Sequence, residues 1–175
     1  MKQRSSPISS GRSNRPSPDN HAIRSGKGVK FEKSVTINRT PEELFTFWRN
    51  FENLTRVMKH VESVECQDER RSHWRARISE DKMVEWDAEI INEHPNELIA
   101  WQSLPGSDVR QAGTVRFTPA AGGLGTEVKL AIEYEVPGGF FTRLVAKVSH
   151  SPEEQIHEDL RHFKQLMESE DIPRY

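Results

Sequence analysis

Thr40-Pro41-Glu42-Glu43 and Ser151-Pro152-Glu153-Glu154 are two helix starts, and the region between them decides the fold of this chain. Each start has Thr or Ser at the N-cap, Pro at the first helical position and Glu at the third, which is the pattern of a capping box. After the first helix, about six short runs with alternating apolar residues follow before the second helix begins. This order predicts a curved antiparallel sheet with one long helix packed on it.

The segment before the first helix, residues 31–37, alternates as a half-buried strand does. The helix that follows carries an apolar face at helical spacing, formed by Leu44, Phe47, Trp48 and Phe51. Asn53 is expected to cap a second short helix over residues 54–60. The final helix places its apolar residues on one face in the same way: Ile156, Leu160, Phe163 and Met167.

Residues 83–92 alternate most cleanly among the sheet runs. Glu85, Asp87 and Glu89 oppose apolar residues there, so we expect these carboxylates on the solvated outer face. The other expected strands are residues 61–67, 72–79, 97–104, 113–119 and 126–136. Short connections between them indicate an antiparallel meander.

Composition places the chain among proteins without a membrane-spanning segment. It has 175 residues, of which 30% are charged, and a mean hydropathy of −0.78. No apolar run approaches the ~20 residues of a membrane helix, and the N-terminus lacks the apolar stretch of a secretory signal. Cys66 is the single cysteine, which excludes an intrachain disulfide. These features predict a cytoplasmic protein.

Charge divides the chain into two parts. Residues 1–30 hold seven basic residues and one acidic residue, whereas the remainder holds 18 basic and 26 acidic residues. Residues 1–29 are also poor in apolar side chains, so we expect a disordered basic arm followed by one folded domain over residues 30–172. The arm is either a solvated tail or a tether for a polyanion. Its dispersed charges, with no interleaved aromatic residue, favour the tail.

A resemblance to a known family supports this architecture. The chain resembles the polyketide cyclase/dehydrase-like group of the START-like (SRPBCC) superfamily, whose members have the helix-grip fold, an α+β fold in which a curved antiparallel sheet of about seven strands wraps around a long C-terminal helix. The matching segments are residues 35–45, 47–54, 58–60, 72–74, 85–90, 99–103, 113–117, 125–128 and 158–168. The superfamily includes lipid carriers, hormone-binding proteins and aromatase/cyclases, so the resemblance implies the fold more specifically than an activity.

Three tryptophans, Trp74, Trp86 and Trp101, lie on separate expected strands in phase with apolar neighbours. They form either an aromatic wall whose N–H groups meet a ligand oxygen, or a packed core. The candidate ligand-binding residues lie on the expected inner faces of the sheet and the last helix: Trp74, Trp86, Trp101, Phe117, Tyr134, Leu160 and Phe163. They would hold a small hydrophobic or aromatic molecule in a cavity between the sheet and the last helix.

The alternative function is a cyclase/dehydratase-type enzyme that acts on a polyketide-like substrate in the same cavity. It requires an inward titratable group, and His60, at a helix-to-strand junction, is the candidate acid or base. The inward faces read as nearly all apolar, which favours binding over catalysis. A third alternative is an interaction protein whose interior is filled by its own side chains. No metal-ligand spacing or nucleotide motif is present, so neither a metal nor another cofactor is predicted.

Overall fold

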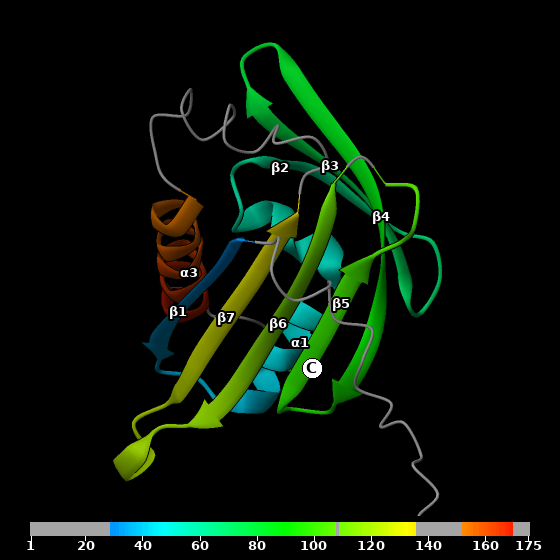
Figure 1. Cartoon of the computed structure of the whole chain (residues 1–175). Coiled ribbons are helices and arrows are strands. Elements are labelled where there is room, and N and C mark those ends of the chain that lie inside the picture. Colours follow the sequence, from blue (N-terminus) through cyan, green and yellow to red (C-terminus); the bar gives the residue numbers. More distant parts are fainter. Residues whose placement is uncertain (1–28, 108, 136–151, 170–175) are drawn as a thin grey trace, which may run out of the picture.

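The computed structural model describes residues 29–107, 109–135 and 152–169. Seven strands form one antiparallel sheet in the order β1-β7-β6-β5-β4-β3-β2 (Figure 1). Their bounds are Val29–Ile37 (β1), Val61–Cys66 (β2), Arg71–Ser79 (β3), Lys82–His94 (β4), Leu98–Ser103 (β5), Arg110–Pro119 (β6) and Thr126–Glu135 (β7). The helical elements are α1 (Pro41–Arg49), α3 (Pro152–Ser169) and the 3-10 helices η1 (Phe51–Arg56) and η2 (Ala121–Gly123). The predicted meander of about seven strands is confirmed.

The start of α1 has the predicted capping box. The Thr40 side chain accepts a hydrogen bond from the Glu43 N–H, and the Glu43 carboxylate accepts one from the Thr40 N–H. The second predicted helix is wrong in type and position, because η1 begins at Phe51 and Asn50 caps it in place of Asn53. Ser151, the expected cap of α3, and the predicted arm (1–29, apart from Val29, which opens β1) lie outside the described residues.

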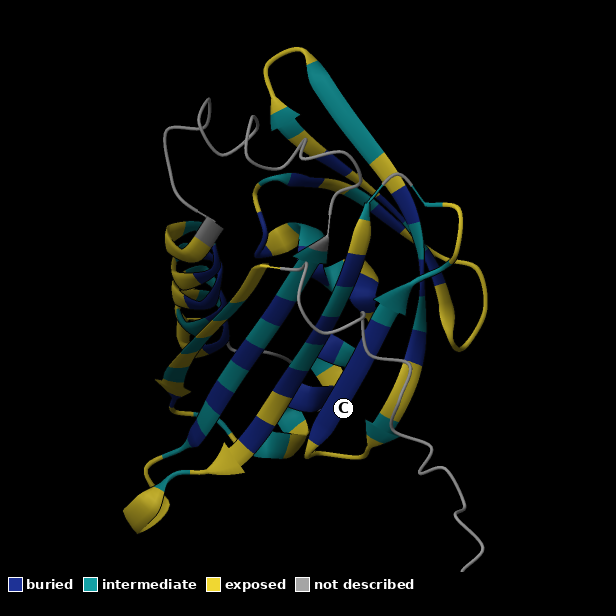
Figure 2. Cartoon of the chain, viewed as in Figure 1, coloured by how far each residue is buried: buried dark blue, intermediate teal, exposed yellow. Residues whose placement is uncertain are grey.

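Bulges curve one half of the sheet. The registers of the β2–β3, β3–β4 and β4–β5 pairs shift at Val61/Ser63, Arg77/Ser79 and Ile90/Asn92, and each shift bends the bulged strand. Buried and exposed residues alternate along most strands, so the sheet has a buried inner face and a solvated outer face (Figure 2). The elements α1, η1 and α3 pack on that inner face.

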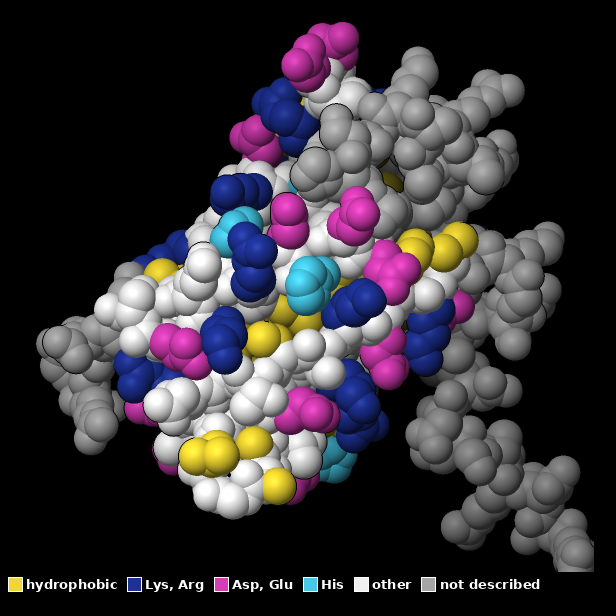
Figure 3. All heavy atoms as spheres, turned by 90° about the vertical axis from the view of Figure 1, so that its left-hand side faces the viewer, with side chains coloured by type: hydrophobic (Ala, Val, Ile, Leu, Met, Phe, Trp, Pro, Cys, Tyr) yellow, Lys and Arg dark blue, Asp and Glu magenta, His cyan; other side chains and the backbone are white. Residues whose placement is uncertain are grey.

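Helix α3 lies alongside β1 at one edge of the sheet (Figure 1). Its inner residues Ile156, Leu160, Phe163 and Met167 are buried, as predicted. Lys33 on β1 pairs with Glu153 at 2.7 Å, and Lys164 donates to the Thr36 carbonyl at 2.6 Å. Charged side chains of both signs cover the surface on this side (Figure 3). Among the described residues, no helix is long and apolar enough to cross a membrane.

Candidate functional site

Four aromatic side chains form one cluster on the inner face. Trp74 on β3 stacks on Trp86 on β4 with ring centroids 5.8 Å apart. Phe51 of η1 lies 5.6 Å from Trp74 and 5.6 Å from Trp101 on β5. The three indoles are 3%, 7% and 2% exposed, respectively. The structure therefore brings the three predicted tryptophans together, with Phe51 as a link that the sequence did not suggest.

The indole N–H groups of this cluster differ in their hydrogen bonds. The Trp74 N–H donates to the Ser72 hydroxyl at 2.8 Å. Neither the Trp86 nor the Trp101 N–H has an acceptor among the described residues. A buried donor without an acceptor costs about 1–3 kcal/mol of desolvation free energy. The cluster thus presents two unpartnered donors inside an apolar environment.

Trp101 lies flat against the neighbouring strand because residue 113 is glycine. Trp101 and Gly113 are directly paired between β5 and β6. A Cβ atom at Gly113 would collide with Cζ2 and Cε2 of the indole. The sequence gives no hint of this contact, since it depends on the register of two strands.

The remaining apolar candidates lie elsewhere in the core. Phe117 meets Phe45 of α1 edge-on, with ring centroids 6.0 Å apart. Phe163 packs on Trp48 at 5.2 Å and is fully buried. Leu160, one turn earlier on α3, is 1% exposed. Phe117 thus joins α1 to the sheet and Phe163 joins α3 to α1, and in the described part of the chain no ring contact links either residue to Trp74, Trp86 or Trp101.

Tyr134 marks a polar end of the inner face. It lies near the end of β7 and pairs in register with Gln111 near the start of β6. Its side chain is hydrogen-bonded to Gln111, which is itself buried. Burial raises the pKa of Tyr134 to about 12, the Gln111 bond opposes this, and the charge of Asp159 adds to it. Tyr134 is therefore protonated at neutral pH and sits near an acidic residue of α3.

That acidic residue, Asp159, corrects the expectation of a nearly apolar interior. It is 3% exposed, and its Oδ1 accepts a hydrogen bond from Gln155 at 3.1 Å. Its Oδ2 lies 3.8 Å from Nδ1 of His60, a separation too long for a hydrogen bond. His60 exposes 31% of its side chain, yet its Nδ1 is buried and unpartnered among the described residues. We call Asp159, His60, Gln155, Tyr134 and Gln111 the interior polar group.

Burial shifts the pKa values of His60 and Asp159 in opposite directions. It lowers the pKa of His60 to about 4. It raises the pKa of Asp159 to about 7; the Gln155 bond opposes this, and the charge of Glu158 adds to it. Both shifts favour the neutral forms, as expected where desolvation outweighs attraction. At neutral pH the site thus has a neutral imidazole beside a carboxyl group that is partly protonated.

Asp159 was recognisable from spacing alone. It lies three residues after Ile156 and four before Phe163, so helical periodicity places it on the apolar face of α3. Gln111 was less recognisable, because the expected strand began at residue 113, whereas β6 begins at Arg110. A buried group that donates or accepts a proton near neutral pH is the arrangement that acid–base chemistry uses.

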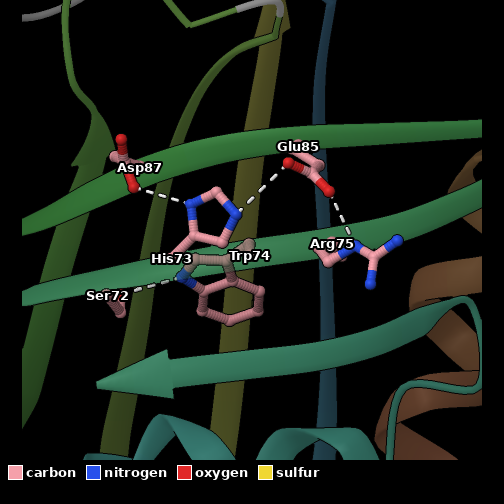
Figure 4. A network of polar contacts seen from close by, with 6 residues as sticks. All are labelled: Ser72, His73, Trp74, Arg75, Glu85 and Asp87. Atoms are coloured by element: carbon pink, nitrogen blue, oxygen red, sulfur yellow. Dashed lines mark hydrogen bonds and ion pairs between the residues drawn. The ribbon is translucent and has the colours of Figure 1, made fainter. Parts of the chain in front are cut away.

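The carboxylates Glu85 and Asp87 of β4 lie on the outer face, as expected. His73 Nδ1 is 2.8 Å from Asp87, and its Nε2 is 3.5 Å from Glu85 (Figure 4). Arg75 also pairs with Glu85, at 2.7 Å. The hydrogen bond to Asp87 is the main cause that raises the pKa of His73. This network joins β3 to β4 across the surface and does not contribute to the interior.

Two further features bear on ligands. In the described part of the chain, no three His, Cys, Asp or Glu side chains are placed to hold a metal ion. An open hollow of about 420 Å³ lies beside α1. Its walls come from α1 and the β2–β3 turn and include none of the predicted residues: Phe45, Thr46, Arg49, Asn50, Cys66 and Asp68.

Comparisons with known proteins agree with this fold. A model of the family described as polyketide cyclase / dehydrase and lipid transport matches residues 37–165. An uncharacterized 17.2 kDa protein of Streptomyces lincolnensis is 31% identical over 88 residues, which span 50% of this chain and 57% of that protein. The match therefore spans little more than half the length of that relative.

Two crystal structures show the same architecture over nearly their whole length. A Deinococcus radiodurans protein is 34% identical, with a TM-score of 0.67, and the match covers 81% of this chain and 98% of that one. An aromatase/cyclase of Streptomyces sp. R1128 is 14% identical, with a TM-score of 0.68 and coverage of 85% and 99%. The second likeness concerns the fold alone. Together they confirm the predicted helix-grip architecture.

Proposed function

Because the chain belongs to the polyketide cyclase / dehydrase and lipid transport family, we propose that it binds a small hydrophobic or aromatic molecule between the inner face of the sheet and α3. The observation that carries the proposal is that the interior polar group and the aromatic cluster are both buried on the inner side of the sheet. Asp159, Tyr134 and Gln111 are oriented inward on α3, β7 and β6. A purely structural core of this size gains nothing from a desolvated carboxyl group.

The proposed ligand is apolar over most of its surface and polar at one end. Its apolar part contacts the cluster of Trp74, Trp86 and Trp101, whose rings offer large contact areas. Its polar end meets the interior polar group, which supplies both donors and acceptors. This division resembles other small-molecule sites, where few polar groups fix the orientation within an apolar wall.

Native mass spectrometry of the purified protein tests the proposal, with a co-purified small molecule as the expected result. Titration with N-phenyl-1-naphthylamine, a neutral apolar fluorophore, gives a second measurement. We expect saturable binding that Trp86→Ala weakens, whereas Leu124→Ala, at a site that is 73% exposed, leaves it unchanged. Absence of both a co-purified molecule and saturable binding would refute the proposal.

A second candidate function is the acid–base enzyme, and the His60–Asp159 pair favours it. In a dehydration, a base removes a proton next to a carbonyl, and an acid protonates the leaving hydroxyl, which departs as water while the C=C bond forms. Neutral His60 suits the first role, and protonated Asp159 suits the second.

The probe 4-hydroxy-4-(2-naphthyl)butan-2-one tests this second function, because its loss of water gives a conjugated enone with red-shifted absorbance. The enzyme hypothesis expects acceleration by the protein that Asp159→Asn removes while binding of the naphthylamine probe persists. If the wild-type protein does not accelerate the loss of water, the enzyme hypothesis is refuted and the binding proposal is unaffected.

A further inference from the structure

We infer that the ligand carries a neutral acceptor oxygen, of the ketone class, which accepts a hydrogen bond from the indole N–H of Trp101. This inference rests on the proposed binding function and specifies the chemistry of its ligand. It excludes two common classes of apolar ligand, the plain hydrocarbon and the carboxylate-bearing fatty acid.

The first argument is the contrast between two tryptophans of the same cluster. Trp74 and Trp101 are equally buried, at 3% and 2% exposed, and both pack on Phe51. The Trp74 N–H is satisfied by Ser72, which lies two residues earlier on the same face of β3. The Trp101 N–H has no acceptor among the described residues. Since buried donors are almost always paired, this N–H is available to an acceptor that the described chain does not supply.

The second argument is where the Trp101 N–H lies. Cε2, the atom bonded to Nε1, sits over Gly113 on the inner face of β6. Gln111 is two residues from Gly113 on the same face, a distance of about 7 Å along the strand. Gln111 holds Tyr134, so the part of the indole next to its N–H lies about two residues along β6 from the interior polar group. An oxygen at this position would belong to a ligand that contacts both the aromatic cluster and the interior polar group.

The third argument concerns charge. Among the described residues, Lys82 at the start of β4 is the one Lys or Arg in inward phase on β3 to β7, and it already has an interaction of its own. The other inward residues on these strands carry no positive charge: Ser72, Trp74, Ala76, Ile78, Val84, Trp86, Ala88, Ile90, Ile99, Trp101, Ser103, Gln111, Gly113, Val115, Phe117, Val128, Leu130, Ile132 and Tyr134. On β1 the inward Lys33 already pairs with Glu153. A carboxylate buried here would meet the acidic Asp159 and no free cation on these strands, which is costly. A neutral carbonyl avoids this cost and still accepts the N–H.

Three probes with one ring skeleton test the inference: fluorene, 9-fluorenone and fluorene-2-carboxylate. Their dissociation constants are measured by displacement of N-phenyl-1-naphthylamine. A neutral hydrogen bond contributes about 0.5–1.5 kcal/mol, so fluorenone should bind about two- to tenfold more tightly than fluorene. The carboxylate should bind more weakly than either. In Trp101→Phe the ratio of the fluorene and fluorenone dissociation constants should fall to about one, whatever the change in the two affinities, and circular dichroism checks that the variant is folded.

Trp74→Phe is the matched control, because its N–H is already bonded to Ser72. The advantage of fluorenone should persist in this variant. Equal affinities of fluorene and fluorenone for the wild type would overturn the inference and leave the binding function intact. Tightest binding by the carboxylate, or an advantage that survives in Trp101→Phe, would overturn it equally. If neither the three probes nor N-phenyl-1-naphthylamine binds, both this inference and the proposed binding function are refuted.

Discussion

Replacement of Asp159 by Asn should change how the stability of the protein depends on pH. The Asp159 carboxyl is 3% exposed, and burial raises its pKa from 3.8 to about 7. A raised folded-state pKa means that the protonated form stabilises the fold. This contribution is fully present below the unfolded-state pKa near 4 and is lost as pH rises towards 7. Asn has the shape of the protonated acid but does not titrate, so the stability of Asp159→Asn should lack this fall with rising pH.

The size of the effect follows from the shift. About three pKa units, each worth about 1.36 kcal/mol, give an upper limit of ~4 kcal/mol. The free energy of unfolding of the variant, minus that of the wild type, should therefore rise by up to ~4 kcal/mol between pH 4 and pH 8, and most steeply between pH 5 and pH 7. His60 is present in both proteins, so its own titration largely cancels in the difference.

Urea unfolding followed by circular dichroism, at half-unit steps from pH 4.5 to pH 8.5, measures this difference. Asp81→Asn is the matched control, because it removes the same charge from an exposed position in the turn between β3 and β4. Its difference from the wild type should be nearly flat across the range. A flat difference for Asp159→Asn as well, or one that falls as pH rises, would refute the assignment of a buried carboxyl that is protonated near neutrality.

Three further perturbations test the packing and the surface network. Gly113→Ala should cost about 1–3 kcal/mol of unfolding free energy, because the new methyl group displaces the indole that lies over this glycine; an unchanged urea midpoint would contradict the contact. Phe163→Ala should cost about 3–5 kcal/mol, since the ring is fully buried, whereas the exposed Gln165→Ala should cost less than about 0.5. Asp87→Asn should lower the pKa of His73, measured by NMR titration of its ring protons. Protonated His73 stabilises the β3–β4 hairpin at pH values below its unfolded-state pKa, and this contribution is lost as the pH rises through the raised folded-state pKa. Asp87→Asn should therefore lower the free energy of unfolding more at pH 6 than at pH 9, by less than about 1 kcal/mol because both side chains are partly exposed.

The sheet and its faces were predictable because both depend on local patterns. Alternation along residues 83–92 placed Trp86 inside and Glu85 outside, and both positions are confirmed. The capping box at Thr40 fixed the start of α1 to the residue. The segment after α1 was not predictable in the same way. Asn50 and Asn53 are both good caps, and the choice between them depends on how Phe51 packs against Trp74 and Trp101, a contact between distant segments.

The interior polar group shows a different limit of local patterns. Asp159 has the spacing of a buried residue, but an acidic side chain at such a position is normally read as solvated, because burial of a charge is costly. The expectation holds for the charged form only. Burial leaves Asp159 largely neutral at acidic pH although the Gln155 bond opposes this effect, and a neutral carboxyl group can occupy the core at moderate cost.

The same reasoning separates the two tryptophans on which the ligand proposal depends. Trp74 finds its acceptor in Ser72, two residues away on one strand, and the sequence alone could have paired them. Trp101 lies over Gly113, and this depends on the register of β5 with β6. A glycine there removes the side chain that would lift the indole from the sheet, and with it a neighbour that could have accepted its N–H. Local sequence thus satisfies one donor, while strand register leaves the other without an acceptor among the described residues, over a glycine two residues from Gln111. That difference makes the inner face a candidate binding surface and not merely a packed core.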